Sequence, residues 1–209
     1  HHIFFLATAL FLLLSFSHNA SATMIGDWDV QSAPISASMN GITNGFINGW
    51  LNTTYTPITI QDALAGPNIL DSGVANLSVS SFQLTFESGS VQNNAGDDLV
   101  LFDARYDAGY YTISSSYDGY SSILPVAPAA FLTTGETRDY YLQGTAPTRL
   151  FPATIYGAAI DLSLLGIPDG ALVSDFRIMA FSAGCDFIGM GSLTPASTPS
   201  MNNPEPATM

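Results

Sequence analysis

The stretch Asp98-Leu99-Val100-Leu101-Phe102-Asp103 places four consecutive apolar residues between two aspartates. A short unbroken run of leucine, valine and phenylalanine is typical of a strand that is buried on both faces. A strand with one face in water would instead alternate apolar and polar residues. We therefore predict that Leu99–Phe102 forms a strand covered on both sides.

Segments with alternating apolar residues lie on both sides of this run, and turn residues such as Asp118-Gly119 separate them. The apolar phase changes at Ser80-Ser81, which indicates a bulge or two short strands. No segment shows a long helical period, so we predict an all-β, antiparallel β-sandwich of the jelly-roll type. The predicted strands contain Leu77 and Val79; Phe82, Leu84 and Phe86; Tyr111, Ile113, Ser115 and Tyr117; Tyr140–Leu142, with a weaker signal; Tyr156, Ala158, Ile160 and Leu162; Phe176, Ile178 and Ala180; and Phe187–Leu193.

The segment before these strands has a different pattern. Asn-Gly pairs recur every four residues at Asn40, Asn44 and Asn48, which is too short a spacing for a strand between turns. Gln61–Ala65 predicts one helical turn that ends at Gly66-Pro67. We therefore expect residues 23–74 to form an irregular N-terminal part of the domain, and residues 75–193 to form the sandwich core.

Two sets of residues resemble the galactose-binding-like (discoidin-type) jelly roll. The first is Asp98–Asp103 followed by Ser116-Tyr117-Asp118-Gly119, and the second is Ile160–Ser163 with the later Cys185-Asp186-Phe187-Ile188-Gly189. Cys185 stands where that family has Phe, and Tyr120 stands where it has Trp. The resemblance implies a jelly-roll fold over about residues 75–193.

The first residues of the chain predict export. Ile3–Phe16 is an almost continuous apolar run, shorter than the about 20 residues that cross a bilayer. Ala20-Ser21-Ala22 then supplies the small side chains that signal peptidase requires, so we predict a cleavable signal helix at residues 1–22. Only His1 and His2 precede the apolar run, and we expect the natural chain to extend before them. A buried helix or an anchor is the alternative interpretation.

The last residues, 194–209, are rich in Pro, Ser and Thr and predict a disordered linker. Pro204, Glu205 and Pro206 near its end resemble the sorting motif of PEP-CTERM proteins. The resemblance implies sorting by an exosortase to the outer surface of a Gram-negative bacterium. That family carries a transmembrane helix and a basic cluster after the motif, so we expect a membrane anchor beyond Met209 or a degenerate tail.

Composition excludes several partners. The chain has 17 Asp and Glu against 4 Lys and Arg, all of them Arg, and its formal net charge is −13. This charge repels phosphate backbones and anionic lipids, so we expect no nucleic-acid partner. Cys185 is the only cysteine, and we expect a buried, reduced thiol rather than a link between molecules.

The available side chains also exclude several kinds of catalysis. All three histidines, His1, His2 and His18, fall in the predicted signal, and the chain has no lysine. Histidine-dependent nucleophilic catalysis, Schiff-base lysine chemistry and histidine zinc sites are therefore excluded from the mature domain. A pair of carboxylates remains as a catalytic alternative, but no spacing marks Glu87, Glu136 or any aspartate as a pair. We expect no enzyme activity.

Oxygen-rich side chains between Asn93 and Asp98 have two interpretations. Asp97 and Asp98, with Asp186 just before the last predicted strand, would supply ligands for Ca²⁺, the only cofactor that the sequence suggests. The alternative is a turn in which these side chains cap their own backbone.

Five tyrosines lie between positions 106 and 120, and they too have two interpretations. Tyr110 and Tyr120 would stack on sugar rings and form hydrogen bonds to them. The alternative is that the tyrosines fill the core and line its rim. We therefore expect a non-catalytic exported surface or matrix protein associated with exopolysaccharide or biofilm. The alternative is a jelly-roll carbohydrate-binding module that bound calcium would stabilise.

Overall fold

The computed structural model describes residues 22–41, 50–54, 56–77, 80–104, 110–142, 150–181 and 185–193. Antiparallel strands make up most of these segments, and the α-helix among them, α1 (Ile60–Leu64), is short. The predicted all-β antiparallel fold is confirmed. The signal peptide and the sorting motif predicted at the two ends lie outside the described residues, apart from Ala22.

Two sheets face each other. Six strands close into a barrel in the order β10-β11-β7-β13-β5-β4, with β4 paired to β10, and five strands form an open sheet in the order β3-β6-β12-β8-β9. β1 and β2 form a separate hairpin. The barrel strands are β4 (Trp50–Asn52), β5 (Ser72–Leu77), β7 (Leu99–Ala104), β10 (Leu132–Leu142), β11 (Leu150–Ile160) and β13 (Cys185–Ser192). The remaining strands are β1 (Thr23–Ile25), β2 (Trp28–Val30), β3 (Ser36–Met39), β6 (Ser80–Thr85), β8 (Tyr111–Ser115), β9 (Leu124–Val126) and β12 (Asp175–Ala180).

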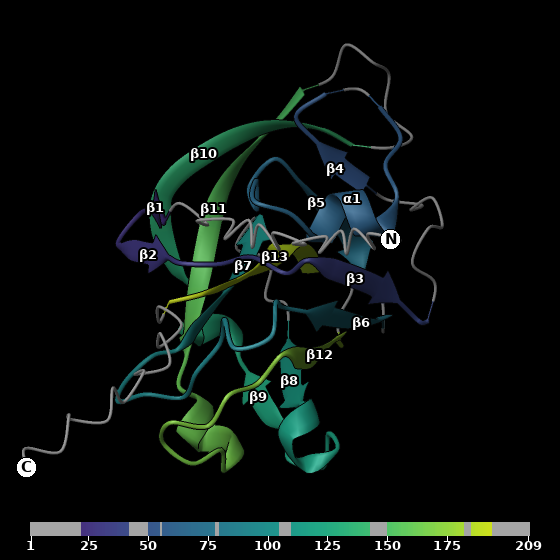
Figure 1. Cartoon of the computed structure of the whole chain (residues 1–209). Coiled ribbons are helices and arrows are strands. Elements are labelled where there is room, and N and C mark those ends of the chain that lie inside the picture. The colour runs from purple at the N-terminus through teal and green to yellow at the C-terminus, as the bar shows by residue number, and fades with distance from the viewer. Residues whose placement is uncertain are drawn as a thin grey trace, which may run out of the picture.

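β7 is the strand that both hydrophobic cores share. Leu99 and Leu101 belong to a core between the barrel and the five-stranded sheet, whereas Val100 and Phe102 belong to a second core made by the inward faces of the barrel strands. All six residues of β7 are buried. The prediction that Leu99–Phe102 is covered on both faces is therefore confirmed. In Figure 1, β10 arches over the barrel, and β6, β12, β8 and β9 lie on the opposite side of the molecule.

The β1–β2 hairpin packs on the barrel at positions where glycine leaves room. A Cβ atom at Gly157 would lie 2.9 Å from the Trp28 ring, and a Cβ atom at Gly191 would lie 2.5 Å from Val30. The Trp28 ring also meets Phe102 edge-on, with 6.2 Å between the ring centroids. Glycine at these two positions thus lets the hairpin join the second core.

Several strands differ in length from their predictions. β10 spans eleven residues where the sequence predicted only Tyr140–Leu142, because most of its residues are polar and its partner β11 determines its length. β8 ends at Ser115 rather than Tyr117, and the 3₁₀-helix η1 (Ser116–Asp118) follows it. The described part of residues 23–74, expected to be irregular, contains β1, β2, β3, β4, the start of β5 and, at the predicted helical turn, α1. Two further 3₁₀-helices are η2 (Pro128–Ala130) and η3 (Leu162–Leu165).

The outer edge of β3 is covered by one side chain of α1. The Gln61 side-chain oxygen accepts a hydrogen bond from the Ala37 backbone N–H at 2.8 Å, and its amide nitrogen donates to the Ile35 carbonyl at 2.9 Å. Gln61 thus satisfies the groups that a further strand would otherwise pair with. Covered edges of this kind oppose edge-to-edge association of sheets.

Among the residues that the structure describes, no helix has the length and apolar character needed to cross a lipid bilayer.

We expect Gln61→Ala to lower the free energy of unfolding by about 1–2 kcal/mol, because it leaves the Ala37 N–H and the Ile35 carbonyl unpaired. It should also increase self-association, since the edge of β3 becomes available. Urea denaturation and sedimentation velocity measure the two effects. Gln31→Ala is the matched control, because the Gln31 side chain makes only a 3.5 Å contact with the nearby Asp29 carbonyl. Equal stability and equal self-association of the two variants would contradict the role of Gln61.

Candidate functional site

The outer face of the five-stranded sheet is polar. Phe82, Leu84, Phe176 and Ile178 in β6 and β12 are buried in the core between the sheets. The alternate positions of the same strands therefore point away from the core and into solvent. Those positions are Ser81, Gln83, Thr85, Asp175, Arg177 and Met179.

The register of the sheet aligns these residues into rows across the strands. Gln83 is paired with Ser38 of β3 on one side and with Arg177 of β12 on the other, and Arg177 is paired with Ser114 of β8. Side chains directly opposite each other on adjacent strands have their Cβ atoms about 5 Å apart. This row therefore forms one continuous polar surface.

An open groove of about 310 Å³ lies on this surface. Hydroxyl, amide and guanidinium groups line it, and its lining contains no carboxylate. Asp175 lies outside the groove, two residues before Arg177 in β12, and its carboxylate oxygens accept hydrogen bonds from the hydroxyls of Thr85 and Ser174, both at 2.7 Å. The lining residues are Ser38, Asn40, Gly41, Ser81, Gln83 and Arg177.

Tyr120 packs against the Arg177 side chain of the groove. The Arg177 Cζ atom lies 4.2 Å from the centroid of the Tyr120 ring, and the Gln83 side-chain amide donates a hydrogen bond to the Tyr120 hydroxyl at 3.3 Å. Burial raises the pKa of the Tyr120 phenol, the nearby Asp175 carboxylate raises it further, and Arg177 opposes both. The phenol is therefore neutral at neutral pH, and its hydroxyl is available as a hydrogen-bond donor.

The backbone is strained at two positions beside this surface. Asn40 has φ 50° and Tyr120 has φ 66°, and they are the non-glycine residues with positive φ in the described part of the chain. Asparagine tolerates this region, but a bulky side chain there costs about 1–2 kcal/mol. The Tyr120 backbone N–H donates to the Ser115 carbonyl at 2.8 Å, which holds the turn after β8 in place. The strain is compatible with a turn that fixes the tyrosine ring beside Arg177.

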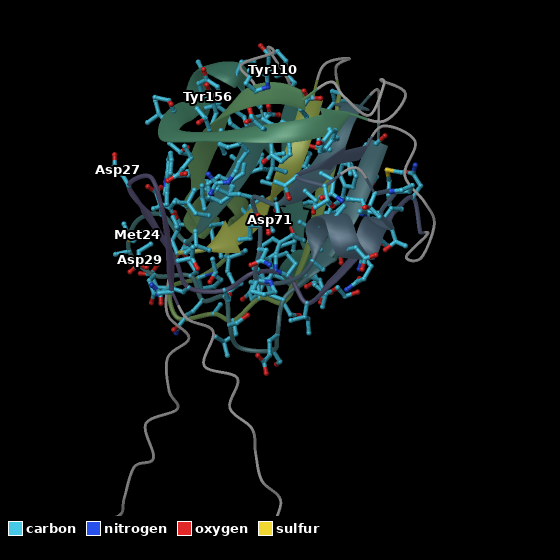
Figure 2. All side chains as sticks on the ribbon, turned by 90° about the horizontal axis from the view of Figure 1, so that it is seen from above. Met24, Asp27, Asp29, Asp71, Tyr110 and Tyr156 are labelled. Carbon is cyan, nitrogen blue, oxygen red and sulfur yellow. The ribbon has the colours of Figure 1, made fainter. Side chains whose placement is uncertain are left out.

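Tyr110, the other tyrosine predicted to bind carbohydrate, is not among the residues that line the groove. It is exposed and lies before β8, whereas Tyr120 follows the turn at the other end of β8. Its backbone carbonyl accepts a hydrogen bond from the Phe181 N–H at 2.8 Å. Figure 2 shows Tyr110 and Tyr156 at the same end of the molecule. The two tyrosines predicted to bind carbohydrate therefore lie at opposite ends of β8.

The three aspartates predicted to bind calcium do not meet. The Leu193 N–H, just after the end of β13, donates to the Asp98 carbonyl at 2.8 Å, whereas Asp186 lies near the start of that strand. Seven residues of a strand span roughly 20 Å. Asp186 is buried, Asp97 is exposed, and no group of three metal-ligating side chains occurs among the residues described. The structure does not support a calcium site built from these residues.

Asp98 instead caps backbone groups, as in the alternative interpretation of this segment. One carboxylate oxygen accepts a hydrogen bond from the Asn94 N–H and the other accepts one from the Leu162 N–H, both at 2.9 Å. Asn93 connects the same turn to the loop after β11, because its amide donates to the Ile167 carbonyl at 2.6 Å. Burial raises the pKa of Asp98, while the two backbone donors oppose this shift.

A buried polar contact lies between the sheets at the opposite end of β7. The Tyr111 hydroxyl of β8 donates a hydrogen bond to the Asp103 carboxylate of β7, and both residues are buried. Cys185 lies beside Tyr111, and burial followed by the charge of Asp103 raises the pKa of the Tyr111 phenol. The prediction that Cys185 is a buried free thiol is confirmed. This cluster has no exposed face, so it links the two sheets and is not an open site.

The sequence analysis did not identify Gln83, Arg177 and Asn40 as candidate site residues. The available signal was the alternation around Phe82, Leu84, Phe176 and Ile178, whose complementary positions form the outer face. The order of the strands, which brings β3, β6 and β12 side by side, was not available from that alternation.

Comparisons of the chain with family models, with curated proteins and with solved structures give no match.

We expect Asp98→Ala to lower the free energy of unfolding by about 2 kcal/mol, because the Asn94 and Leu162 N–H groups lose their acceptor. The difference from the wild type should depend on pH. Folding raises the pKa of Asp98 above its ordinary value of 3.8, so the folded state binds this proton more tightly than the unfolded state. The contribution of Asp98 is therefore complete below pH 3.8 and decreases as the pH rises through the raised pKa.

Denaturation of both proteins at about pH 3 and about pH 7 measures this dependence. A difference in stability that is larger at pH 7 would contradict it. A melting temperature that rises with Ca²⁺ in the wild type but not in Asp98→Ala would show that Asp98 is a metal ligand instead.

Proposed function

We propose that this protein is an exported, non-catalytic surface or matrix protein that binds exopolysaccharide through the groove on its five-stranded sheet. The observation that carries the proposal is the combination of Tyr120, Arg177 and Gln83 beside an open polar groove. An open groove admits an internal segment of a polymer, whereas an enclosed pocket admits only a chain end or a small molecule.

The chemistry of the groove suits a sugar. Sugar rings present an apolar face of C–H groups and an edge of hydroxyls, so they bind to an aromatic ring beside amide and hydroxyl groups. Tyr120 supplies a neutral phenol, and Ser38, Ser81 and Asn40 supply polar groups along the groove. The resemblance of Asp98–Asp103 and Ser116–Gly119 to galactose-binding-like domains agrees with this ligand class.

Two observations favour binding without catalysis. The mature domain contains no histidine or lysine, since all three histidines precede residue 23 and the basic residues are arginines. Glycoside hydrolysis requires two carboxyl groups on either side of the scissile bond. The residues that line the groove include none.

Export and sorting are proposed from the sequence of the two ends. The apolar run with Ala20-Ser21-Ala22 supports cleavage by signal peptidase. Pro204, Glu205 and Pro206 at the end of a Pro/Ser/Thr-rich linker support recognition by an exosortase-type system. A protein held at the outer surface by such a tail would meet exopolysaccharide at the place where it is deposited.

We expect Tyr120→Ala to weaken binding to an exopolysaccharide fragment by about tenfold, or about 1.4 kcal/mol, because it removes the ring that packs on Arg177. A glycan array with the mature domain identifies the ligand, and isothermal titration calorimetry then measures the affinities. Tyr117→Ala is the matched control, since Tyr117 is an exposed tyrosine three residues earlier and the ring beside Arg177 is that of Tyr120. Tyr110→Ala should also bind normally.

Failure of the wild-type domain to bind any glycan would refute the proposed function. Equal losses in the Tyr120→Ala and Tyr117→Ala variants would refute the placement of the site.

A further inference from the structure

Arg177 has unused hydrogen-bonding capacity. A guanidinium group has five N–H donors, all at its edge and in its plane. The contact with Tyr120, at 4.2 Å from Cζ to the ring centroid, is not a hydrogen bond to an acceptor atom. No described residue accepts a hydrogen bond from this guanidinium, and the described salt bridge pairs Arg138 with Glu136 instead.

This charge is unusual in its setting. The chain has four arginines and a formal net charge of −13, so a cation without a carboxylate partner is unexpected on its surface. The nearest carboxylate on the same strand face belongs to Asp175, which is hydrogen-bonded to Thr85 and Ser174. The groove extends from Arg177 toward Ser81 and Asn40, which is the direction away from Asp175.

Other donors are directed to the same groove. The Asn40 side-chain oxygen accepts the Ser81 backbone N–H at 3.3 Å, which leaves the Asn40 amide nitrogen as a donor. Ser38 and Ser81 add hydroxyl groups to the lining. One cation, two side-chain amides and two hydroxyls without any anion make a lining that is complementary to a carboxylate.

We propose that the groove binds an acidic sugar, with Arg177 holding the carboxylate of a uronate residue. This inference rests on the proposed function and specifies its ligand class. A carboxylate accepts two parallel hydrogen bonds from the edge of a guanidinium, and such charge-assisted pairs are stronger than hydrogen bonds between neutral groups. The net negative charge of the protein opposes a polyanion at long range, but salt near 0.15 M screens charges that are more than about 8 Å apart.

The test compares trigalacturonic acid with its fully methyl-esterified form by isothermal titration calorimetry at about 0.15 M salt. Esterification keeps the rings and hydroxyls and removes the charge. We expect the wild-type domain to bind the free acid at least about tenfold more tightly than the ester. Arg177→Gln should bind the two forms equally, and Arg177→Lys should keep part of the preference, because an ammonium keeps the charge without the planar pair of donors.

A second variant tests the groove without removing Arg177. Asn40→Asp adds a negative charge to the lining at a residue whose φ of 50° aspartate also tolerates. It should weaken binding of the free acid at least about tenfold more than it weakens binding of the ester, because only the acid is repelled by the added charge. Asn68→Asp is the charge-matched control, because Asn68 is exposed and does not line the groove.

The outcomes separate the two proposals. Equal affinity of the wild type for the acid and the ester, or binding of neutral glycans alone, would refute the acidic ligand and leave the carbohydrate site in place. Equal binding of an oligoglutamate peptide would show a general carboxylate site and refute selection of a sugar. No binding to any glycan would refute both proposals.

Discussion

The burial of β7 on both faces is the constraint on which the rest of the structure depends. Its alternate residues enter two cores, so the barrel on one side and the five-stranded sheet on the other must both be present for the strand to be covered. Burial of apolar area stabilises each side by about 25 cal/mol per Å². The two strands that hydrogen-bond to β7 are β11 and β13, so the position of β7 also determines the positions of β11 and β13. The Tyr111–Asp103 hydrogen bond adds a directional link between the same two sheets.

The candidate groove follows from this arrangement. The inner residues of β6 and β12 are fixed in the core, and the period of two along a strand directs Gln83 and Arg177 outward. Their spacing is therefore determined by the sheet and not by a mobile loop. Tyr120 is the exception, because a turn with positive φ holds it beside Arg177. A binding surface on paired strands retains its geometry without bound ligand, which reduces the entropy lost on binding.

Identical polar residue types have different roles in this protein because their surroundings differ. Asp98 accepts two backbone N–H groups and closes a turn, Asp103 accepts the Tyr111 hydroxyl between the sheets, and Asp175 accepts two hydroxyls at the surface. A sequence pattern that groups aspartates by their proximity along the chain predicts a metal site. The hydrogen-bond geometry instead assigns each of these three carboxylates to its own protein donors.

The sequence by itself determined the fold class and the central strand, because Leu99–Phe102 and the alternating segments around it carry a periodic signal that does not depend on distant residues. It also determined that residues 23–209 contain no histidine and no lysine. Only the tertiary structure decided that the barrel closes, that Tyr110 and Tyr120 lie at opposite ends of β8, and that Gln83 and Arg177 line the groove that Tyr120 adjoins. These features depend on which strands are neighbours. Strand order is determined by packing between residues far apart in the chain, and no local pattern encodes it.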